Sequence, residues 1–565
     1  MKRFVSILFF MTVLFFWLVT PEYVQANSLN RNEVVLKKCK SFAKQVIKEN
    51  TTYIIKYDFD LKGTTVTIPN GCVLQFEGGS VYGGILKGEK MQSDDIYTPE
   101  MFGAVKMRDD NDAIQSALNI CHHIQMDGEY RVFANKDNKG NASLLIPGNT
   151  HIVLNGIVNY ETPSLDTYCI FMVYEASDVS ISGSGKLIGD KAFHKGISGE
   201  WGHGIGLYYS KNVLIEGVEC CNLWGDAIYM YYGSPVCENV TVRDVYLHDC
   251  RRQGISVTGG ENIKIESFRI ENIRGANPQS AIDIENHSTK PINDVTINDG
   301  VIRSCNQGVI LQNKPSQDVA NGSGYRAGGR LSNISITRVK SDSPCLLTHN
   351  VDFDKCESPV SIVGPCTIQN SRIKINETAN VEGLDGDCLI RNCDIDRLSN
   401  QAKSPQIEVY FKDCKLSFGD AVDEYFRNAN GSLFKFTDCK IFFNTAIENP
   451  YVVGNSEFRR CVIDCFDTPY LRSRVYDSEI IVRLKGNDSR VFINRGRTEI
   501  YNSTIKILST KDIPLYYLEQ GEGRENLIIE GATIMDLSAK RKRVIDKTSG
   551  SKTVRDKGTK YQISK

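Results

Sequence analysis

One short strand pattern recurs five times between residues 203 and 313. Its copies are Gly204-Ile-Gly-Leu, Ala227-Ile-Tyr-Met, Gly254-Ile-Ser-Val, Ala281-Ile-Asp-Ile and Gly308-Val-Ile-Leu. The first aliphatic residues of successive copies are 23, 27, 27 and 27 residues apart. Within each copy aliphatic residues alternate with other types, as in a strand that buries one of its faces. A short strand that repeats at nearly constant spacing, without helices between the copies, predicts a β-solenoid.

Two further strand patterns accompany the first. One reads Asn212-Val-Leu-Ile, Asn239-Val-Thr-Val, Asn262-Ile-Lys-Ile and Asp294-Val-Thr-Ile, and the other reads Gly217-Val-Glu-Cys, Asp244-Val-Tyr-Leu, Ser267-Phe-Arg-Ile and Gly300-Val-Ile-Arg. Together the three patterns predict an all-β fold with three short strands in each coil. The repeated asparagine is expected to be structural, because side-chain amides at one turn position can hydrogen-bond from coil to coil.

The rest of the chain is organised around this repeat. We expect a small β-rich segment at 27–98, a helical region at 99–130, the coils that carry a site at 131–340, further coils at 341–540 and a basic tail at 541–565. Ala113, Ile114, Ala117 and Leu118 are spaced as on one face of a helix, after Asp109-Asp110-Asn111, which can cap it. Because a solenoid end exposes apolar core and unpaired strand edge, this helix is expected to be a cap.

The first 26 residues have the features of a secretory signal peptide. Lys2 and Arg3 precede an apolar run from Phe4 to Val19, and Val24-Gln25-Ala26 offers a cleavage site. The run is short for a membrane span, which needs about 20 apolar residues, so an uncleaved anchor is the less favoured alternative. The first cysteine is Cys39, which does not suit a lipoprotein anchor. We therefore expect a secreted or periplasmic protein without a membrane span after cleavage.

The charge balance argues against several classes of partner. The chain has 67 basic and 68 acidic residues and a formal net charge of −1. Such a balance produces no bulk field for nucleic acid or an anionic membrane. No stretch resembles a nucleotide-binding loop or a zinc motif. The oligomeric state does not follow from the sequence.

Several of the eighteen cysteines occupy one position of successive coils. Each of Cys393, Cys414, Cys439 and Cys461 precedes an inward aliphatic residue by two positions, and Ser371, Ser478 and Ser503 take the same place in other coils. Stacked coils lie about 4.8 Å apart. We interpret this as an internal ladder of small residues in which free cysteine packs as a small hydrophobe. Cys220-Cys221 and the pair Cys461 and Cys465 remain open to disulfide pairing.

The organisation resembles the pectate-lyase-like superfamily of right-handed parallel β-helix proteins over roughly residues 100–540. Phe102-Gly103-Ala104, with the helix that follows, is similar to the superfamily's entry motif and capping helix. The block from Gly183 to Tyr229 is similar to polygalacturonases and to β-helix depolymerases of phage tails, and Arg251–Val257 and Ala281–Glu285 look like a subgroup of such proteins. The resemblance implies a right-handed helix but no single activity, because the superfamily includes lyases, hydrolases, epimerases, esterases and binding proteins. The catalytic Asp-Asp pair and Arg-x-Lys of polygalacturonases could not be placed in this sequence, which argues against a direct assignment to them.

The strand alignment also gathers chemically active side chains on one outer patch about three coils, roughly 15 Å, tall. Aromatic rings suit the faces of sugars, and arginines suit carboxylates or sulfates. A surface ion-pair network is the structural alternative. The expected members are Trp224, Asp226, Tyr229, Tyr231, Arg251, Arg252, Gln253, Asp283 and Glu285.

The segment 190–202 has no aliphatic period and is expected to be a long turn that enters the same patch. It brings His194, Lys195, Glu200 and Trp201 to the rim. A loop rich in titratable and aromatic residues on a rigid scaffold is a common place for function. His203 follows the loop and is more often structural than chemical at such a position.

These residues leave several chemistries open, with a polysaccharide as the expected partner. In β-elimination on an acidic, uronate-containing chain, Arg251 and Arg252 would neutralise the substrate carboxylate while a histidine, Lys195 or a tyrosine acts as base. In glycoside hydrolysis, two carboxylates from Glu200, Asp226, Asp283 and Glu285 would act as acid and as base or nucleophile. Elimination is placed slightly ahead because of the paired arginines. No motif demands a cofactor; Asp283 and Glu285 could hold calcium, and a non-enzymatic glycan-binding protein is the third alternative.

Overall fold

A computed structural model describes most of the chain after residue 30. The described ranges are 31–105, 109–287, 290–312, 331–347, 351–362, 366–378, 388–398, 408–418, 433–443, 451–466, 470–484, 490–494, 498–509, 516–520, 527–537, 545–546 and 554–563. The predicted signal segment lies outside these residues. None of the helices within these ranges is long and apolar enough to cross a membrane.

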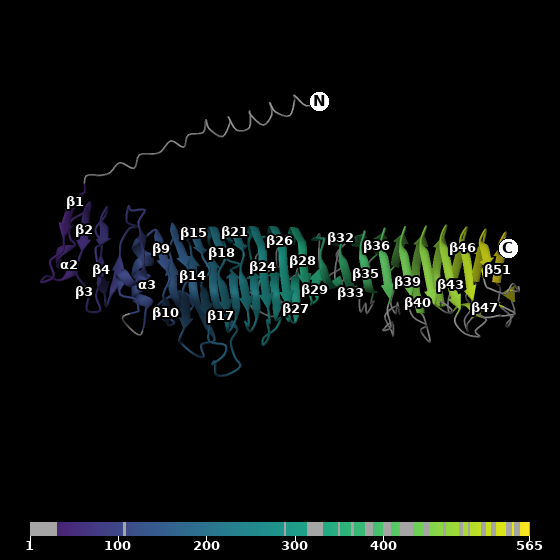
Figure 1. Cartoon of the computed structure of the whole chain (residues 1–565), viewed down its shortest axis with the longest axis horizontal. Coiled ribbons are helices and arrows are strands. Elements are labelled where there is room, and N and C mark those ends of the chain that lie inside the picture. The colour runs from purple at the N-terminus through teal and green to yellow at the C-terminus, as the bar shows by residue number, and fades with distance from the viewer. Residues whose placement is uncertain are drawn as a thin grey trace, which may run out of the picture. The chain divides into compact units, whose positions relative to one another are not determined.

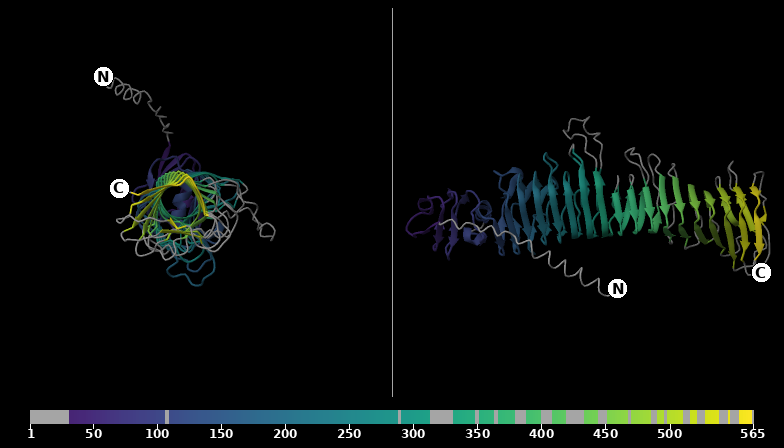
Figure 2. Two further views of the ribbon diagram at one scale, coloured as in Figure 1. Left: turned by 90° about the vertical axis from the view of Figure 1, so that its right-hand side faces the viewer. Right: turned by 90° about the horizontal axis from the view of Figure 1, so that it is seen from above.

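The chain divides into two units, of which the second contains residues 107–111 and 123–565. This unit is a stack of parallel strands whose coils follow one another along one axis (Figures 1 and 2). In the stack that the sequence repeat predicted, β17 (Trp201–Tyr208), β20 (Asp226–Met230), β23 (Gln253–Val257) and β25 (Ser280–Glu285) pair in order. Ile205, Ile228, Ile255 and Ile282 are directly opposite one another in these pairings. The register predicted from the spacing is therefore confirmed.

Two other strand stacks complete each coil. One contains β15 (Ser177–Ser182), β18 (Lys211–Glu216) and β21 (Glu238–Arg243), and the other contains β16 (Lys186–Ile188), β19 (Glu219–Cys221) and β22 (Tyr246–His248). In β24 (Glu261–Glu271), β26 (Ile292–Arg303) and β28 (Leu331–Ser341) the two stacks join into one continuous strand, and β28 then pairs separately with β30 (Val351–Asp354) and β31 (Glu357–Ile362). The prediction of three strands per coil thus holds in the earlier coils, and the coils of β24, β26 and β28 merge two of them.

Alternation along each strand directs aliphatic side chains to the inside of the coils. Ile205, Ile228, Ile255 and Ile282 have no exposed surface. On the outside, Asn239 Nδ2 donates to Asn212 Oδ1 at 3.0 Å, and Asn262 Nδ2 donates to Asn239 Oδ1 at 2.8 Å. All three asparagines have a positive φ near 55°, a conformation that asparagine tolerates better than most residues. The structural interpretation of this asparagine ladder is confirmed.

The cysteine column also lies where the sequence placed it. Cys393, Cys414, Cys439 and Cys461 are buried, and each thiol donates to the carbonyl two residues earlier over 3.2–3.3 Å. Ser371, Ser478 and Ser503 donate to the equivalent carbonyl at 2.6–2.7 Å. Hydroxyl and thiol are interchangeable at this position because each satisfies the same turn carbonyl.

Reduction is expected to leave the stability of the fold nearly unchanged, because the column is interpreted as free thiols. The measurement is a thiol count on denatured protein with and without prior reduction, and the two counts should agree. Substantially fewer thiols before reduction, traced to residues 393, 414, 439 and 461, would contradict the ladder interpretation.

Coil pairing continues further toward the C-terminus than predicted. β51 (Val554–Lys557) pairs with β48 (Leu527–Glu530), and β52 (Lys560–Ile563) pairs with β49 (Thr533–Asp536). The basic segment 541–565, expected to be a tail, therefore contributes strands in its described residues. The apolar residues of β51 and β52 are Val554, Tyr561 and Ile563, which are too few for a strand pattern to stand out in the sequence.

The first unit contains residues 1–106 and 112–122. Its described part has a parallel sheet of β1 (Asn32–Val35), β2 (Thr51–Ile55) and β5 (Val73–Phe76), which confirms a small β-rich segment. The predicted helix is α3 (Asn111–Ile120), and Asp109 Oδ1 accepts from the Asn111 N–H at 2.9 Å. Within this unit Ser116 and Asn119 hydrogen-bond the backbone of Leu86 at 3.0 and 2.8 Å. The role of the helix as a cap of the coils stays a prediction.

Candidate functional site

The parallel register brings residues far apart in sequence onto neighbouring rungs. Asp226 is opposite Gln253, Gln253 is opposite Ser280, and Ser256 is opposite Asp283. Because successive coils pair without a shift here, the polar residue at the start of each strand lies beside its equivalent in the next coil. These side chains meet on the stack formed by β17, β20, β23 and β25.

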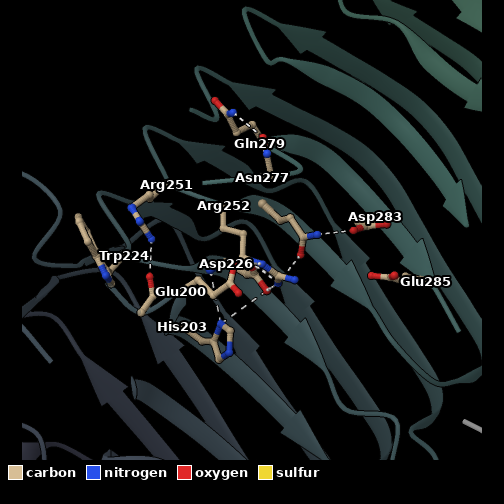
Figure 3. Close-up of polar contacts among 12 residues, drawn as sticks. Glu200, His203, Trp224, Asp226, Arg251, Arg252, Asn277, Gln279, Asp283 and Glu285 are labelled. Atoms are coloured by element: carbon tan, nitrogen blue, oxygen red, sulfur yellow. Dashed lines mark hydrogen bonds and ion pairs between the residues drawn. The ribbon is translucent and has the colours of Figure 1, made fainter. Parts of the chain in front are cut away.

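The centre of the site is a guanidinium between two carboxylates (Figure 3). Arg252 Nη1 lies 3.0 Å from Asp226 Oδ2, and Arg252 Nε lies 3.2 Å from Glu200 Oε2. Arg252 also donates to Gln253 Oε1 at 3.0 Å. Burial disfavours the charge on Arg252, but Asp226, Glu200 and Asp283 outweigh it and raise the Arg252 pKa. The arginine therefore stays charged and is engaged by the protein's own carboxylates.

Asp226 has an unusual environment for a carboxyl group. Its side chain has no exposed surface, and burial raises its pKa to about 7 although Arg252 acts in the opposite direction. His203 Nδ1 lies 3.7 Å from Asp226 Oδ2, and burial together with Arg252 lowers the His203 pKa to about 3. The histidine is therefore neutral near pH 7, and its contact with Asp226 is not an ion pair. Near neutrality Asp226 can either hold or release a proton.

The polar network continues into the next coil. Gln253 Nε2 donates to Asp283 Oδ2, and Glu285 Oε2 lies 3.1 Å from His287 Nε2. Asp226 and Gln253 are 0% exposed, Asp283 is 1% exposed and His203 is 3% exposed. The expectation that the patch is solvent-facing is wrong for Asp226, Gln253 and Asp283, because Arg252 and Gln253 link them by hydrogen bonds inside a packed surface. The calcium site considered from the sequence at Asp283 and Glu285 stays a prediction.

Three of the predicted site residues hold the 190–202 loop in place. The Trp224 ring is stacked between the His194 ring, at 3.5 Å between centroids, and the Arg251 guanidinium, at 4.0 Å. Arg251 donates to the carbonyls of Ile197 and Gly199, and Trp224 Nε1 donates to the Ser198 carbonyl at 2.9 Å. His194, Trp224 and Arg251 therefore support the loop, and their contact with a ligand stays a prediction.

His194 is moreover directed inward rather than to the rim. Its Nδ1 lies 2.6 Å from Asp190 Oδ2, and Asp190 also accepts from the Tyr168 hydroxyl at 2.7 Å. The His194 and Asp190 side chains are 1% and 0% exposed. Of the other loop residues expected at the rim, Lys195 is exposed, Trp201 is 50% exposed and the Glu200 side chain is 39% exposed.

A surface of tyrosines adjoins the carboxylates. The Tyr229 ring stacks on His203 at 4.5 Å between centroids, and Tyr208 lies 5.2 Å from Tyr231. The surface includes four tyrosines that sequence reasoning did not select, Tyr174, Tyr208, Tyr209 and Tyr232. In the sequence, the Tyr208-Tyr209 and Tyr231-Tyr232 pairs in successive coils could have indicated this aromatic surface. We call Tyr174, Tyr208, Tyr209, Tyr229, Tyr231 and Tyr232 the tyrosine surface.

Comparison with known proteins agrees with the architecture. A family model described as "Right handed beta helix region" matches residues 177–325. Two proteins of Bacillus subtilis strain 168 are similar: uncharacterized protein YclG, 30% identical over 168 residues, and SPbeta prophage-derived uncharacterized protein YorA, 32% identical over 162 residues. The matches cover 26% and 25% of this chain and 28% of each relative. The chain thus matches little more than a quarter of their length.

Solved structures of similar fold include two carbohydrate-related proteins. The tailspike protein of Escherichia coli bacteriophage HK620, solved with a pentasaccharide, has 11% identity and a TM-score of 0.38, over 71% of this chain and 72% of the tailspike. The A-module of the Azotobacter vinelandii mannuronan C-5 epimerase AlgE6 has 14% identity and a TM-score of 0.34, over 79% of this chain and all of the module. Together, the parallel coils and the family match define the class. The chain is a right-handed parallel β-helix.

Proposed function

We propose that this chain binds a polysaccharide on the face of β17, β20, β23 and β25 and cleaves it by hydrolysis. The observation that carries the proposal is Asp226, a buried carboxyl with a pKa near 7, joined through Arg252 to the more exposed Glu200. A carboxyl that retains its proton near neutrality is suited to general-acid catalysis, in which it protonates the leaving oxygen of a glycosidic bond.

Glu200 supplies the second carboxylate in this mechanism. Its side chain is 39% exposed and belongs to the loop that Arg251 and Trp224 hold. In this mechanism it acts as base or nucleophile. Because Asp226 itself is buried, the ion pair between Glu200 and Arg252 has to open for a substrate to reach the acid.

β-Elimination of an acidic polysaccharide is the alternative with a specific observation in its favour. His203 is uncharged near pH 7, as a base must be, and lies in the site. Against elimination, Arg251 and Arg252 are both occupied by protein groups, and burial raises the pKa of Tyr208 and Tyr229 above that of free tyrosine. The cluster of Glu200, Asp226, Asp283 and Glu285 around one central arginine favours a substrate without dense negative charge.

A panel of neutral and uronate-containing glycans distinguishes these functions. Hydrolysis should release reducing ends without ultraviolet absorbance, whereas elimination should release unsaturated ends that absorb. Glycan binding without either product would identify a binding protein and overturn catalysis. Absence of both binding and turnover across the panel would overturn the proposal as a whole.

The tyrosine surface provides a separate prediction about binding. Tyr209→Ala or Tyr232→Ala should weaken glycan affinity by about fivefold, which corresponds to about 1 kcal/mol for one lost aromatic contact. Calorimetry with the glycan identified by the panel measures this effect. The control is Tyr476→Ala, which removes a tyrosine stacked on Tyr501 in distant coils and should leave affinity unchanged. Equal affinity in all three variants would place the glycan elsewhere.

A further inference from the structure

A second cluster of reactive side chains lies on a different strand stack, that of β16, β19 and β22. Glu219 and Cys221 are two residues apart on β19, and His248 is opposite Cys221 on β22 in the next coil. One carboxylate oxygen, the thiol sulfur and a ring nitrogen of these residues all lie within 4.8 Å of one another. The candidate catalytic face is on another stack, so this cluster is separate from it.

The chemistry of these groups suits a transition-metal ion of the zinc type. Cysteine sulfur, imidazole nitrogen and carboxylate oxygen are the three donor kinds that proteins use for zinc. A thiolate and a carboxylate together balance the charge of one divalent cation. Binding would release the Cys221 thiol proton to solvent.

Asp249 orients the histidine as a metal site requires. Its Oδ2 lies 2.5 Å from His248 Nδ1, while His248 Nε2 lies 2.8 Å from Glu219 Oε1. Both ring nitrogens of His248 therefore face carboxylate oxygens, Nδ1 toward Asp249 and Nε2 toward Glu219. A cation between Nε2 and Oε1 satisfies both groups. A histidine that gives its second nitrogen to a carboxylate is the usual outer arrangement of zinc ligands.

Lys186 is the competitor for this position. Its Nζ lies 2.5 Å from Glu219 Oε1, so in the absence of a metal ion the ammonium partly neutralises the carboxylate. A metal ion has to displace this contact. Removal of the Lys186 ammonium should therefore strengthen metal binding, whereas removal of any of the three ligands should weaken it.

We propose that Glu219, Cys221 and His248 bind one divalent transition-metal ion, with zinc as the preferred metal, and that the ion joins two successive coils. Calorimetric titration of the metal-free full chain with zinc, in a Cys39→Ser background, should show one equivalent bound. Cys39 is removed because it is the one exposed cysteine among the eighteen. Cys221→Ser and His248→Ala should each weaken binding by about tenfold or more, and Lys186→Met should strengthen it.

Glu238→Gln is the matched control. Glu238 forms a similar cross-coil pair with Lys211 at 2.9 Å, but it is not a member of the proposed metal site. It should bind zinc as the parent does. Cobalt substitution gives a second readout, since a thiolate–cobalt absorption band should appear in the parent and vanish in Cys221→Ser, the variant closest in shape. Failure to bind an equivalent of zinc, or equal binding by the parent and Cys221→Ser, would overturn the proposal. Neither result depends on catalytic activity.

Discussion

Asp226→Asn should lower polysaccharide turnover by about 100-fold or more while the coils remain folded. The amide keeps the shape of the carboxyl group and can still accept a hydrogen bond from Arg252, but it cannot deliver a proton. Steady-state rates on the glycan identified by the panel, together with circular dichroism, measure the effect. Asp299→Asn is the control, because Asp299 pairs with Arg338 in an exposed position and should retain full activity.

The same assignment predicts the direction of the pH dependence. Activity that requires protonated Asp226 should fall as pH rises through about 7, the pKa of this group in the folded chain. Since that pKa is raised from 3.8, the folded state retains a proton that the unfolded state has lost, so this residue's contribution to stability decreases as pH rises between these values. In Asp226→Asn that contribution should be absent. Full activity in a folded Asp226→Asn variant would transfer the acid role to another carboxyl group.

Arg252→Met should destabilise the coils around the site by about 3 kcal/mol at pH 8. Methionine retains an apolar side chain, so the loss is the charge that compensates buried Asp226 and half-buried Glu200. The cost should be smaller at pH 5, because removal of Arg252 raises the Asp226 pKa further and the neutral acid needs no counter-charge. Unfolding of one region need not be two-state in a solenoid. Hydrogen exchange of the β20 and β23 amides therefore measures the local effect better than a single melting temperature.

The control for this change is Arg243→Met, which removes an exposed pair with Glu216. Arg243 Nε lies 2.6 Å from Glu216 Oε1 and both side chains are substantially exposed, so a loss of no more than about 1 kcal/mol is expected. Equal small effects of the two substitutions would mean that Arg252 acts as an ordinary surface arginine. Such a result would also contradict the burial of Asp226.

The sequence was sufficient to predict the strand stack and which residues share it. An inward aliphatic every 23 to 27 residues permits one register, because a shift by one residue would turn the aliphatic side chains outward. Asp226, Gln253 and Asp283 could therefore be assigned to adjoining rungs before any coordinates. The asparagine ladder and the cysteine column followed from the same period. The predicted helix near residues 109–124 followed from three- and four-residue spacing alone.

The tertiary structure decided which of these residues face water and which pair with one another. The repeat spacing shows which residues occupy equivalent positions in successive coils, but it does not show what packs over them. The burial of Asp226 and His203 was therefore not predictable. The 190–202 loop has no period, and only its folded path shows that Trp224, His194 and Arg251 hold it while Glu200 reaches Arg252. The grouping of Glu219 with Cys221 and His248 likewise depends on side-chain directions across two coils. Repetition determines backbone register because every coil contributes to it, whereas a site depends on a few side-chain contacts that each occur once.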